Sequence, residues 1–211
     1  MTDEPARRYP VPARRVRVED RIEKSRFIAS AARAESSQEA RAFVDALRAE
    51  FPDATHHCFA FVAGPPGSTG AVGASDDGEP AGTAGRPMLS VLMNSGVGEI
   101  VVVVTRYFGG VKLGKGGLVR AYTGAVQHAL RELPTMERVT MHDARVVVSY
   151  AQADAVRRAL ERAGASIVGE EFAANVTFAI RVPDDRHTDL ERSLADATSG
   201  SARIEWHPGG E

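Results

Sequence analysis

The sequence predicts an α+β protein made of two domains. Its 211 residues exceed what one small domain needs and are enough for two. Segments in which apolar and polar residues alternate, typical of half-buried strands, are interspersed with segments of helical period. Near residue 137 the order of these segments changes to strand, helix, strand, strand, helix, strand, the order of a ferredoxin-like domain. We therefore expect a flexible arm at residues 1–14, a first domain at 15–136 and a second at 137–211.

The first domain is expected to mix strands and helices. Residues 15–34 alternate around a charged turn and predict two strands. Ser36 and Glu39 have the spacing of a capping box, which predicts a helix that Pro52 ends. Residues 64–85 are rich in glycine and proline and predict a long loop. The remaining segments predict strands at 55–64 and 99–108 and helices at 86–96 and 117–133.

The second domain is expected to follow the order given above. Val156 and Leu160 give its first helix an apolar side, and acidic residues open its second helix, where they face the positive end of the helix dipole. Strands are expected at 143–150, 165–172, 175–183 and 202–207, and helices at 151–164 and 184–198.

The composition indicates a globular protein of the cytoplasm. Hydrophobic residues make up 43% of the chain and charged residues 26%, which argues against disorder along most of its length. Cys58 is the only cysteine, so no intramolecular disulfide can form, and this usage points to a reducing compartment. No apolar run is long enough to cross a bilayer, and the first residues lack the apolar core of a secretory signal. We expect no membrane partner.

The net charge of −2 conceals an alternation of basic and acidic segments. Residues 1–33 carry +4 and residues 99–150 carry +3, whereas residues 34–98 carry −5 and residues 151–211 carry −4. An overall negative charge argues against binding to nucleic acid. The basic segments can nevertheless create positive potential locally.

Residues 105–122, "TRYFGGVKLGKGGLVRAY", contain no acid and are called the basic segment. They join a predicted strand to a predicted helix, and glycines in such a turn, Gly116 and Gly117 among them, can leave backbone amides free to bind an anion. Tyr107 or Phe108 could stack on bases. The alternative is that the glycines only permit a tight turn and the cations form a solvated face. The cations that we expect to contact phosphates are Arg106, Lys112, Lys115 and Arg120.

The basic segment also contains a near match to a nucleotide-binding loop. Residues 109–115 fit the pattern G-x-x-x-x-G-K between a strand and a helix. Gly116 stands where that motif needs Ser or Thr to hold magnesium, and no apolar strand that ends in an acid stands out as its partner. We therefore do not expect nucleotide hydrolysis, and we predict no cofactor.

Residues 74–87, "ASDDGEPAGTAGRP", are called the acidic loop. Asp76, Asp77 and Glu79 could bind a hard cation such as magnesium, act as an acid–base pair, or pair with the basic segment and hold the loop over it. Like charges this close are unfavourable without counter-charges, so we prefer the third interpretation and place metal binding second. Thr83 is then expected to help begin the next helix.

His56, His57 and Cys58 resemble metal ligands or a catalytic pair only superficially. In a strand, successive side chains point to opposite faces, so at most two of the three can share an ion. No second pair of ligands occurs at the spacing typical of zinc sites. We expect these residues to contribute to packing.

Four stretches together resemble the YigZ/IMPACT family: "EKSRFIA", "THHCFAF", "SDDGEPAGTAGRPML" and "VVVVTRYFGGVKLGKGGLVRAY". All lie within residues 15–130, and none carries a substitution that breaks the family pattern. The resemblance implies a first domain with the fold of domain IV of elongation factor G and of a small-subunit ribosomal protein. It implies a ferredoxin-like second domain, as in bacterial YigZ proteins. It implies no catalytic residue, and it links the chain to translation, because eukaryotic IMPACT proteins act in translational control.

These features predict a regulatory protein that binds RNA, the ribosome or translation factors, with the basic segment as the phosphate contact. Two other classes stay open. One is an enzyme that acts on a small phosphorylated or nucleotide ligand, with Asp76, Asp77 and Glu79 as a metal site. The other is a protein-interaction module in translational control. The sequence indicates no oligomeric state.

Overall fold

The computed structural model describes residues 8–207. The chain divides into two units, Met1–Arg138 and Val139–Glu211. The predicted arm at residues 1–14 lies partly outside the described residues, which begin at Arg8. Within residues 8–207, no helix combines the length and the apolar character needed to cross a bilayer.

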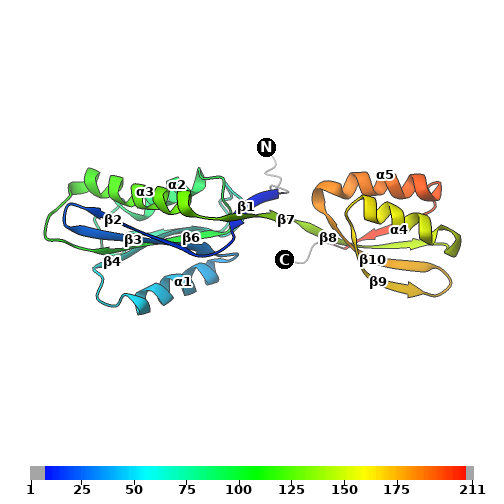
Figure 1. Ribbon diagram of the computed structural model, residues 1–211, viewed down its shortest axis with the longest axis horizontal. Helices are drawn as coiled ribbons and strands as arrows, with labels where there is room; N and C mark the ends of the chain where they lie inside the picture. The colour runs from blue at the N-terminus through cyan, green and yellow to red at the C-terminus, as the bar shows by residue number, and fades with distance from the viewer. Residues whose placement is uncertain (1–7, 208–211) are drawn as a thin grey trace. The chain divides into compact units, whose positions relative to one another are not determined.

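A five-stranded antiparallel sheet forms the centre of the first unit (Figure 1). Its order is β2-β3-β6-β4-β5, so β6 lies in the middle. Both faces of β6 are buried, which explains why its sequence is a continuous run of β-branched residues rather than an alternating one. The strands are β2 (Val16–Ile22), β3 (Ser25–Arg33), β4 (His56–Val62), β5 (Val72–Ser75) and β6 (Ile100–Tyr107).

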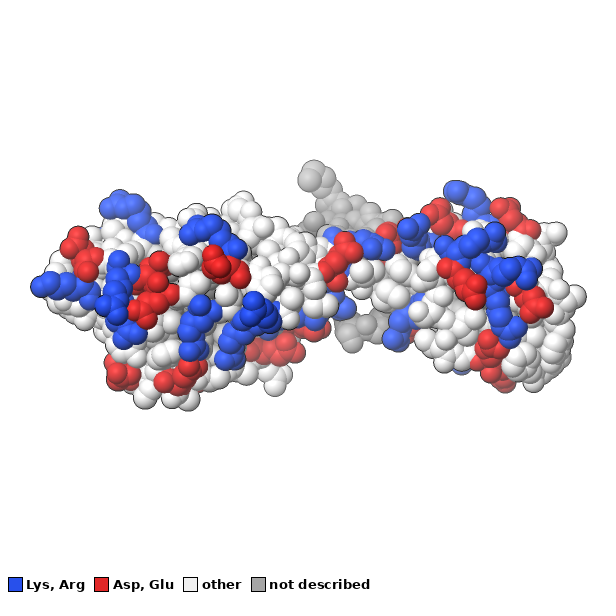
Figure 2. Space-filling view, viewed as in Figure 1, with Lys and Arg blue, Asp and Glu red and all other residues white. Residues whose placement is uncertain are grey.

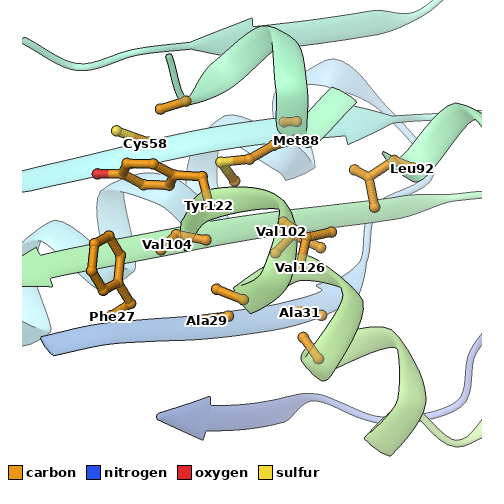
Figure 3. Packing of buried hydrophobic residues seen from close by; sticks show 14 of the residues in the cluster. Phe27, Ala29, Ala31, Cys58, Met88, Leu92, Val102, Val104, Tyr122 and Val126 are labelled. Carbon is orange, nitrogen blue, oxygen red and sulfur yellow. The ribbon is translucent and has the colours of Figure 1, made fainter. Parts of the chain in front are cut away.

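Helices cover both faces of this sheet. Helix α1 (Ser37–Glu50) packs on one face, where Val101 and Val103 of β6 join its core. Helices α2 (Gly85–Met93) and α3 (Gly114–Glu132) cover the other face, where the core includes alternate residues of the same strand. Figure 3 shows this second core, in which Tyr122 of α3 meets Phe27 of β3 edge to face. The predicted mixture of strands and helices in the first domain is confirmed.

The first turn of α1 departs in one detail from the predicted capping box. Ser36 Oγ accepts a hydrogen bond from the Glu39 amide at 3.1 Å, as expected of the N-cap. The Glu39 carboxylate accepts from the amide of Glu35 at 2.9 Å, one residue before the N-cap, rather than from Ser36. The helix start is therefore as predicted, with the return bond shifted by one residue.

Three strands were absent from the predicted set. Strand β5 lies inside the predicted long loop and pairs with β4 at the edge of the sheet. Strand β1 (Arg8–Pro12) pairs with β7 (Thr135–Val139), so residues 8–12 of the predicted arm form a strand. All three strands are only four or five residues long, and β1 and β7 find their partner more than a hundred residues away. Local sequence patterns do not contain that information.

Glu99 connects these outer strands to the sheet. It is 4% exposed, and its backbone lies in the left-handed region with φ of 48°. Its carboxylate accepts hydrogen bonds from Tyr9 Oη at 2.8 Å, Arg33 Nε at 2.8 Å and Arg138 Nε at 3.0 Å. Burial acts to raise the pKa of Glu99, but these three donors outweigh it and lower the pKa. One buried carboxylate thus joins β1, β3 and β7.

The second unit contains a four-stranded antiparallel sheet in the order β11-β8-β10-β9 (Figure 1). With two helices packed against it, this is the βαββαβ arrangement of a ferredoxin-like domain, as predicted. Two short 3₁₀ turns, η1 (Tyr150–Gln152) and η2 (Asp184–Arg186), lead into the helices. The elements are β8 (Met141–Val148), α4 (Ala153–Arg162), β9 (Ser166–Phe172), β10 (Val176–Pro183), α5 (His187–Thr198) and β11 (Arg203–Trp206).

We expect Glu99→Gln to destabilise the protein by about 1–3 kcal/mol, because the substitution removes the charge that accepts from Tyr9 and from two partly exposed arginines. Urea unfolding at neutral pH measures the change. Glu35→Gln is the matched control, since Glu35 pairs with Arg33 at the surface with its side chain 49% exposed, and surface pairs contribute less than about 1 kcal/mol. An equal loss of stability in the two variants would show that Glu99 is not the carboxylate that holds β1, β3 and β7 together.

Candidate functional site

Asp76 organises the acidic loop around the start of α2. Its Oδ1 accepts hydrogen bonds from the amides of Ala84 at 2.9 Å and Gly85 at 2.8 Å, and its Oδ2 accepts from Gly82 at 2.8 Å. Burial acts to raise the pKa of Asp76, but the three amide donors outweigh it and lower the pKa. Asp76 therefore satisfies the free amides at this helix terminus. The prediction that Thr83 helps to begin the helix is wrong in this respect, because its hydroxyl donates to the Pro80 carbonyl at 2.6 Å.

Asp77 turns the other way, toward the start of β4. Its backbone has φ of 42°, and the following Gly78 has φ of 87°, so the chain reverses direction here. Asp77 Oδ2 accepts from the His57 amide at 2.7 Å, and its Oδ1 pairs with Arg48 of α1 at 2.8 Å. Its carbonyl oxygen accepts from His56 Nδ1 at 2.8 Å. Because a carbonyl only accepts, Nδ1 of His56 carries the proton.

Glu79 is the acid that reaches the basic segment. Its Oε1 receives hydrogen bonds from Arg106 Nη1 at 2.5 Å and from Tyr122 Oη at 2.7 Å. The side chains of Glu79 and Arg106 are 3% and 5% exposed. The preferred interpretation was that the acids of the loop pair with the basic segment. Of the three carboxylates, only that of Glu79 does so. Asp76 and Asp77 instead anchor the loop to α2, α1 and β4.

Arg106 lies in the interior rather than among the surface cations. Its guanidinium lies between the rings of Phe27 and Phe108, 5.2 and 5.5 Å from their centroids. Its Nη2 donates to Ser25 Oγ at 3.3 Å, and its buried Nε has no hydrogen-bond partner. A buried donor left unpaired costs about 1–3 kcal/mol. The expectation that Arg106 contacts phosphate from the surface is corrected here, since its charge is compensated internally by Glu79.

Cys58 and His57 are packing residues of β4. Burial raises the pKa of the Cys58 thiol to about 12. The thiol donates to the Asp76 carbonyl at 2.9 Å, and Figure 3 shows the Tyr122 hydroxyl beside it. His57 lies on the opposite face, where its Nε2 donates to the Phe51 carbonyl at 3.2 Å, and burial lowers its pKa. A buried, protonated thiol is a poor nucleophile, so this cluster offers no reactive cysteine.

The remaining cations of the basic segment are exposed. Lys112, Lys115 and Arg120 all face solvent, and no carboxylate among residues 8–207 lies within 4.0 Å of their charged atoms. Helix α3 begins at Gly114, earlier than predicted, so Gly116 and Gly117 form its first turn. That first turn holds no acid and has no side-chain cap. Its free amides and the helix dipole therefore add to the positive potential of the cations.

Tyr107 faces away from this group. Its hydroxyl donates to Asp53 at 2.9 Å, and Arg26 lies 5.1 Å from its ring centroid. Phe108 is 46% exposed beside Arg106. Of the two aromatic residues singled out in the basic segment, the structure brings Phe108 and not Tyr107 to the cations.

The acidic loop and the basic segment enclose a pocket of about 460 Å³. Its size falls within the range of small-molecule sites, about 300–1,000 Å³. The loop contributes Glu79 and its neighbours, the basic segment contributes Arg106, Phe108, Lys112 and Lys115, and β4 contributes His56. Leu113 and Leu118 provide an apolar wall. We call this the β4–α3 pocket.

Several residues of the β4–α3 pocket could not be found from sequence patterns. His56 was assigned to packing, yet its ring lines the pocket with its side chain 19% exposed. Leu113 and Leu118 look like ordinary core residues of a helix start. The only sequence feature that could have pointed to them is that they lie close to Lys112 and Lys115 along the chain. That feature does not distinguish a residue of a pocket wall from a residue of the core.

The three acids do not form a metal site. Across the described part of the chain, no group of three or more His, Cys, Asp or Glu side chains is arranged to hold a metal ion. Asp76, Asp77 and Glu79 are each engaged by different partners, as described above. Their geometry provides a framework for the loop and does not converge on a cation.

The arrangement defines a class: a two-domain α+β protein whose first unit has a glycine-rich strand-to-helix turn without an acid. The model of the Impact N-terminal domain family matches residues 23–130, and that of the domain of unknown function DUF1949 matches residues 146–201. The IMPACT family member YigZ of Escherichia coli is 44% identical over 92% of this chain and 95% of that protein. An IMPACT family member of Haemophilus influenzae is 41% identical over 93% and 96% of the two chains.

A solved structure described as a hypothetical protein matches with a TM-score of 0.69 and 41% identity, covering 97% of this chain and all of that one. The chain belongs to the YigZ/IMPACT family, in agreement with the resemblance found in its sequence.

Asp76→Asn should lower the free energy of unfolding by about 1–3 kcal/mol at neutral pH, because an amide group replaces an oxygen that accepts from backbone amides. The folded pKa of Asp76 is lowered, so its contribution is complete above the unfolded value near 3.9 and is lost as pH falls through the folded value. Urea unfolding of both proteins at neutral pH and below about pH 3.5 measures this. The free energies of unfolding of Asp76→Asn and wild type should differ less in acid than at neutral pH. Asp45→Asn, at an exposed residue of α1, should change stability by less than about 0.5 kcal/mol at either pH.

Cys58 should resist alkylation in the folded protein. With a thiol pKa of about 12, its thiolate fraction at about pH 8 is on the order of 10⁻⁴, against roughly a quarter in the unfolded chain. Iodoacetamide labelling followed by mass spectrometry should modify the denatured protein within minutes and leave the native protein unmodified. Rapid labelling of native protein would contradict a buried thiol.

Proposed function

We propose that this protein binds RNA through the exposed cations of the basic segment and the first turn of α3. The observation that carries the proposal is that Lys112, Lys115 and Arg120 have no carboxylate partner within the described residues, beside a helix N-terminus without an acid. Among residues 8–138, eight of the thirteen other arginines are in ion pairs. Unpaired cations beside free amides attract phosphate groups.

The shape of this surface favours a polyanion over a single small anion. A second hollow of about 430 Å³ adjoins the β4–α3 pocket and shares Lys112 and Leu113 with it. Arg120 and Gly117 line this second hollow, as does one acid, Glu23. Successive hollows on either side of one lysine suit successive nucleotides of a strand, with phosphates near the cations.

Binding here would depend on local charge and not on the charge of the whole surface. Figure 2 shows Lys and Arg interspersed with Asp and Glu over the visible face of the first unit. At physiological salt, charges beyond about 8 Å are largely screened. The potential near Lys112 and Lys115 is therefore set by their immediate neighbours, which is consistent with an RNA site on a chain of net charge −2.

We further propose that the RNA belongs to the translation machinery and that the protein acts in the cytoplasm. The relatives are named only as IMPACT family members. Support for a role in translation comes from the resemblance to the YigZ/IMPACT family, because the eukaryotic members of that family act in translational control. The rival proposal of a metal-dependent enzyme loses its support, because the acids meant to hold the metal are engaged by the protein itself.

Lys112→Ala/Lys115→Ala should weaken the binding of single-stranded RNA and make it less sensitive to salt. Removing two phosphate contacts should reduce the slope of log K against log salt by about 1.4, at about 0.7 for each contact. Fluorescence anisotropy with a labelled oligonucleotide, titrated at several salt concentrations, measures both quantities.

Arg14→Ala/Arg41→Ala is the matched control. Both arginines are exposed, have no recorded ion pair among residues 8–207, and lie outside the basic segment. The control should retain the wild-type slope. A wild-type slope in the lysine variant, or a slope of zero in wild type, would exclude phosphate contacts at this surface.

A further inference from the structure

We propose that the β4–α3 pocket holds one unstacked guanine base of the bound RNA, with its phosphate at Lys112 and Lys115. The inference rests on the proposed RNA binding and specifies what the pocket itself recognises. It depends on the polar groups that line the pocket and are left without partners, on an exposed aromatic ring, and on the position of the cations.

Glu79 supplies the first acceptor. Its Oε1 is occupied by Arg106 and Tyr122, whereas its Oε2 has no hydrogen-bond partner among the described residues. Among the described residues, Arg106 Nε is the only fully enclosed side-chain nitrogen or oxygen that lacks a hydrogen-bond partner. Because Oε2 of Glu79 also lacks a partner, it is not fully enclosed and retains some accessible surface. Glu79 lines the pocket, with its side chain 3% exposed. A carboxylate oxygen that is open to the pocket and has no donor among the described residues can accept a hydrogen bond from a ligand that offers an N–H group.

His56 supplies the second acceptor. Its Nδ1 donates to the Asp77 carbonyl, so in the neutral imidazole Nε2 carries a lone pair. Nε2 has no hydrogen-bond partner among residues 8–207, and it lies 3.9 Å from Oε1 of Glu79, the other oxygen of the carboxylate that offers Oε2. Two acceptors on adjacent side chains fit a ligand that presents two adjacent donors. Among the RNA bases, guanine has this pattern on its Watson–Crick edge, with N1–H beside the 2-amino group.

Phe108 provides a surface for the ring of the base. It is 46% exposed on the pocket wall, and the guanidinium of Arg106 lies over its ring, 5.5 Å from the centroid. Bases in single strands stack on such rings at about 1–3 kcal/mol each. Leu113 and Leu118 line the pocket with it. A planar base therefore meets an apolar wall and two acceptors.

The cations determine which way round the nucleotide lies. Lys112 and Lys115 line the same pocket but are exposed, whereas Glu79 is buried. A phosphate is repelled by the carboxylate and attracted by the ammonium groups. The base accordingly lies inward and the phosphate at the rim, continuous with the second hollow beyond Lys112.

The test measures competition by nucleoside 5′-monophosphates against a labelled single-stranded RNA of about twelve nucleotides. At about pH 8, GMP should compete best. IMP lacks the 2-amino donor and AMP lacks N1–H, so both should compete about tenfold less well, a loss typical of one unpaired buried polar group. UMP should compete least, because it has the smaller ring.

Three variants separate the contributions. His56→Ala should remove most of the preference for GMP over AMP. Phe108→Ala should weaken all purine monophosphates about tenfold, whereas Tyr107→Ala, at the neighbouring aromatic that does not line the pocket, should change them less than twofold. Both substituted pocket residues reach solvent, so the folded state is expected to persist, and thermal unfolding verifies it.

The outcomes distinguish this inference from the proposed function. Equal competition by all monophosphates, or an unchanged affinity in Phe108→Ala, would overturn the guanine pocket. If one of these two results occurs while RNA binding still weakens in Lys112→Ala/Lys115→Ala, RNA binding stands and only the pocket assignment fails. If that variant also binds as wild type, both proposals fail.

Discussion

The ion pair between Glu79 and Arg106 is the interaction on which the site depends. It joins the acidic loop to β6 at a point where both side chains are almost fully buried. A buried charge is tolerated only when it is paired and hydrogen-bonded, and breaking such a pair by removing one partner costs about 3–5 kcal/mol. That is a large part of the 5–15 kcal/mol by which a domain is stable. The loop therefore cannot leave the sheet without a high cost, and the pocket between them is largely preformed.

The acidic loop serves this geometry by sending its three acids in different directions. Asp76 fixes the start of α2, Asp77 fixes the start of β4 and contacts α1, and Glu79 reaches the interior. The divergence requires left-handed backbone at Asp77 and Gly78. Gly85 adds a close approach, since a Cβ there would lie 2.7 Å from the backbone of Ser75. The composition of this stretch, acids among glycines, thus reflects a rigid framework and not a cation site.

Sequence patterns predicted most of the fold because its elements bury regular faces. The unbroken apolar run of β6 and the helical period of α1 each follow from burial, and the order of elements after residue 137 predicted the ferredoxin-like unit. The same reasoning could have placed Arg106 correctly, since alternation along β6 puts it on the face of Val102 and Val104. Arg106 was instead assigned to the surface as one of the four cations of the basic segment. Its partner, Glu79, is 27 residues away, and no local pattern reveals such a pair.

The distribution of charge across the pocket is compatible with the proposed RNA site on a chain of net charge −2. Glu79 neutralises Arg106, so the inner wall presents a carboxylate oxygen and an imidazole instead of a positive charge. The rim presents Lys112 and Lys115 without internal counter-ions. A simple anion would make favourable contacts only with the lysines at the rim. An apolar group would make favourable contacts only with the wall. A ligand that carries a phosphate on a planar, donor-bearing ring gains at both, and this combination is the property of a nucleotide.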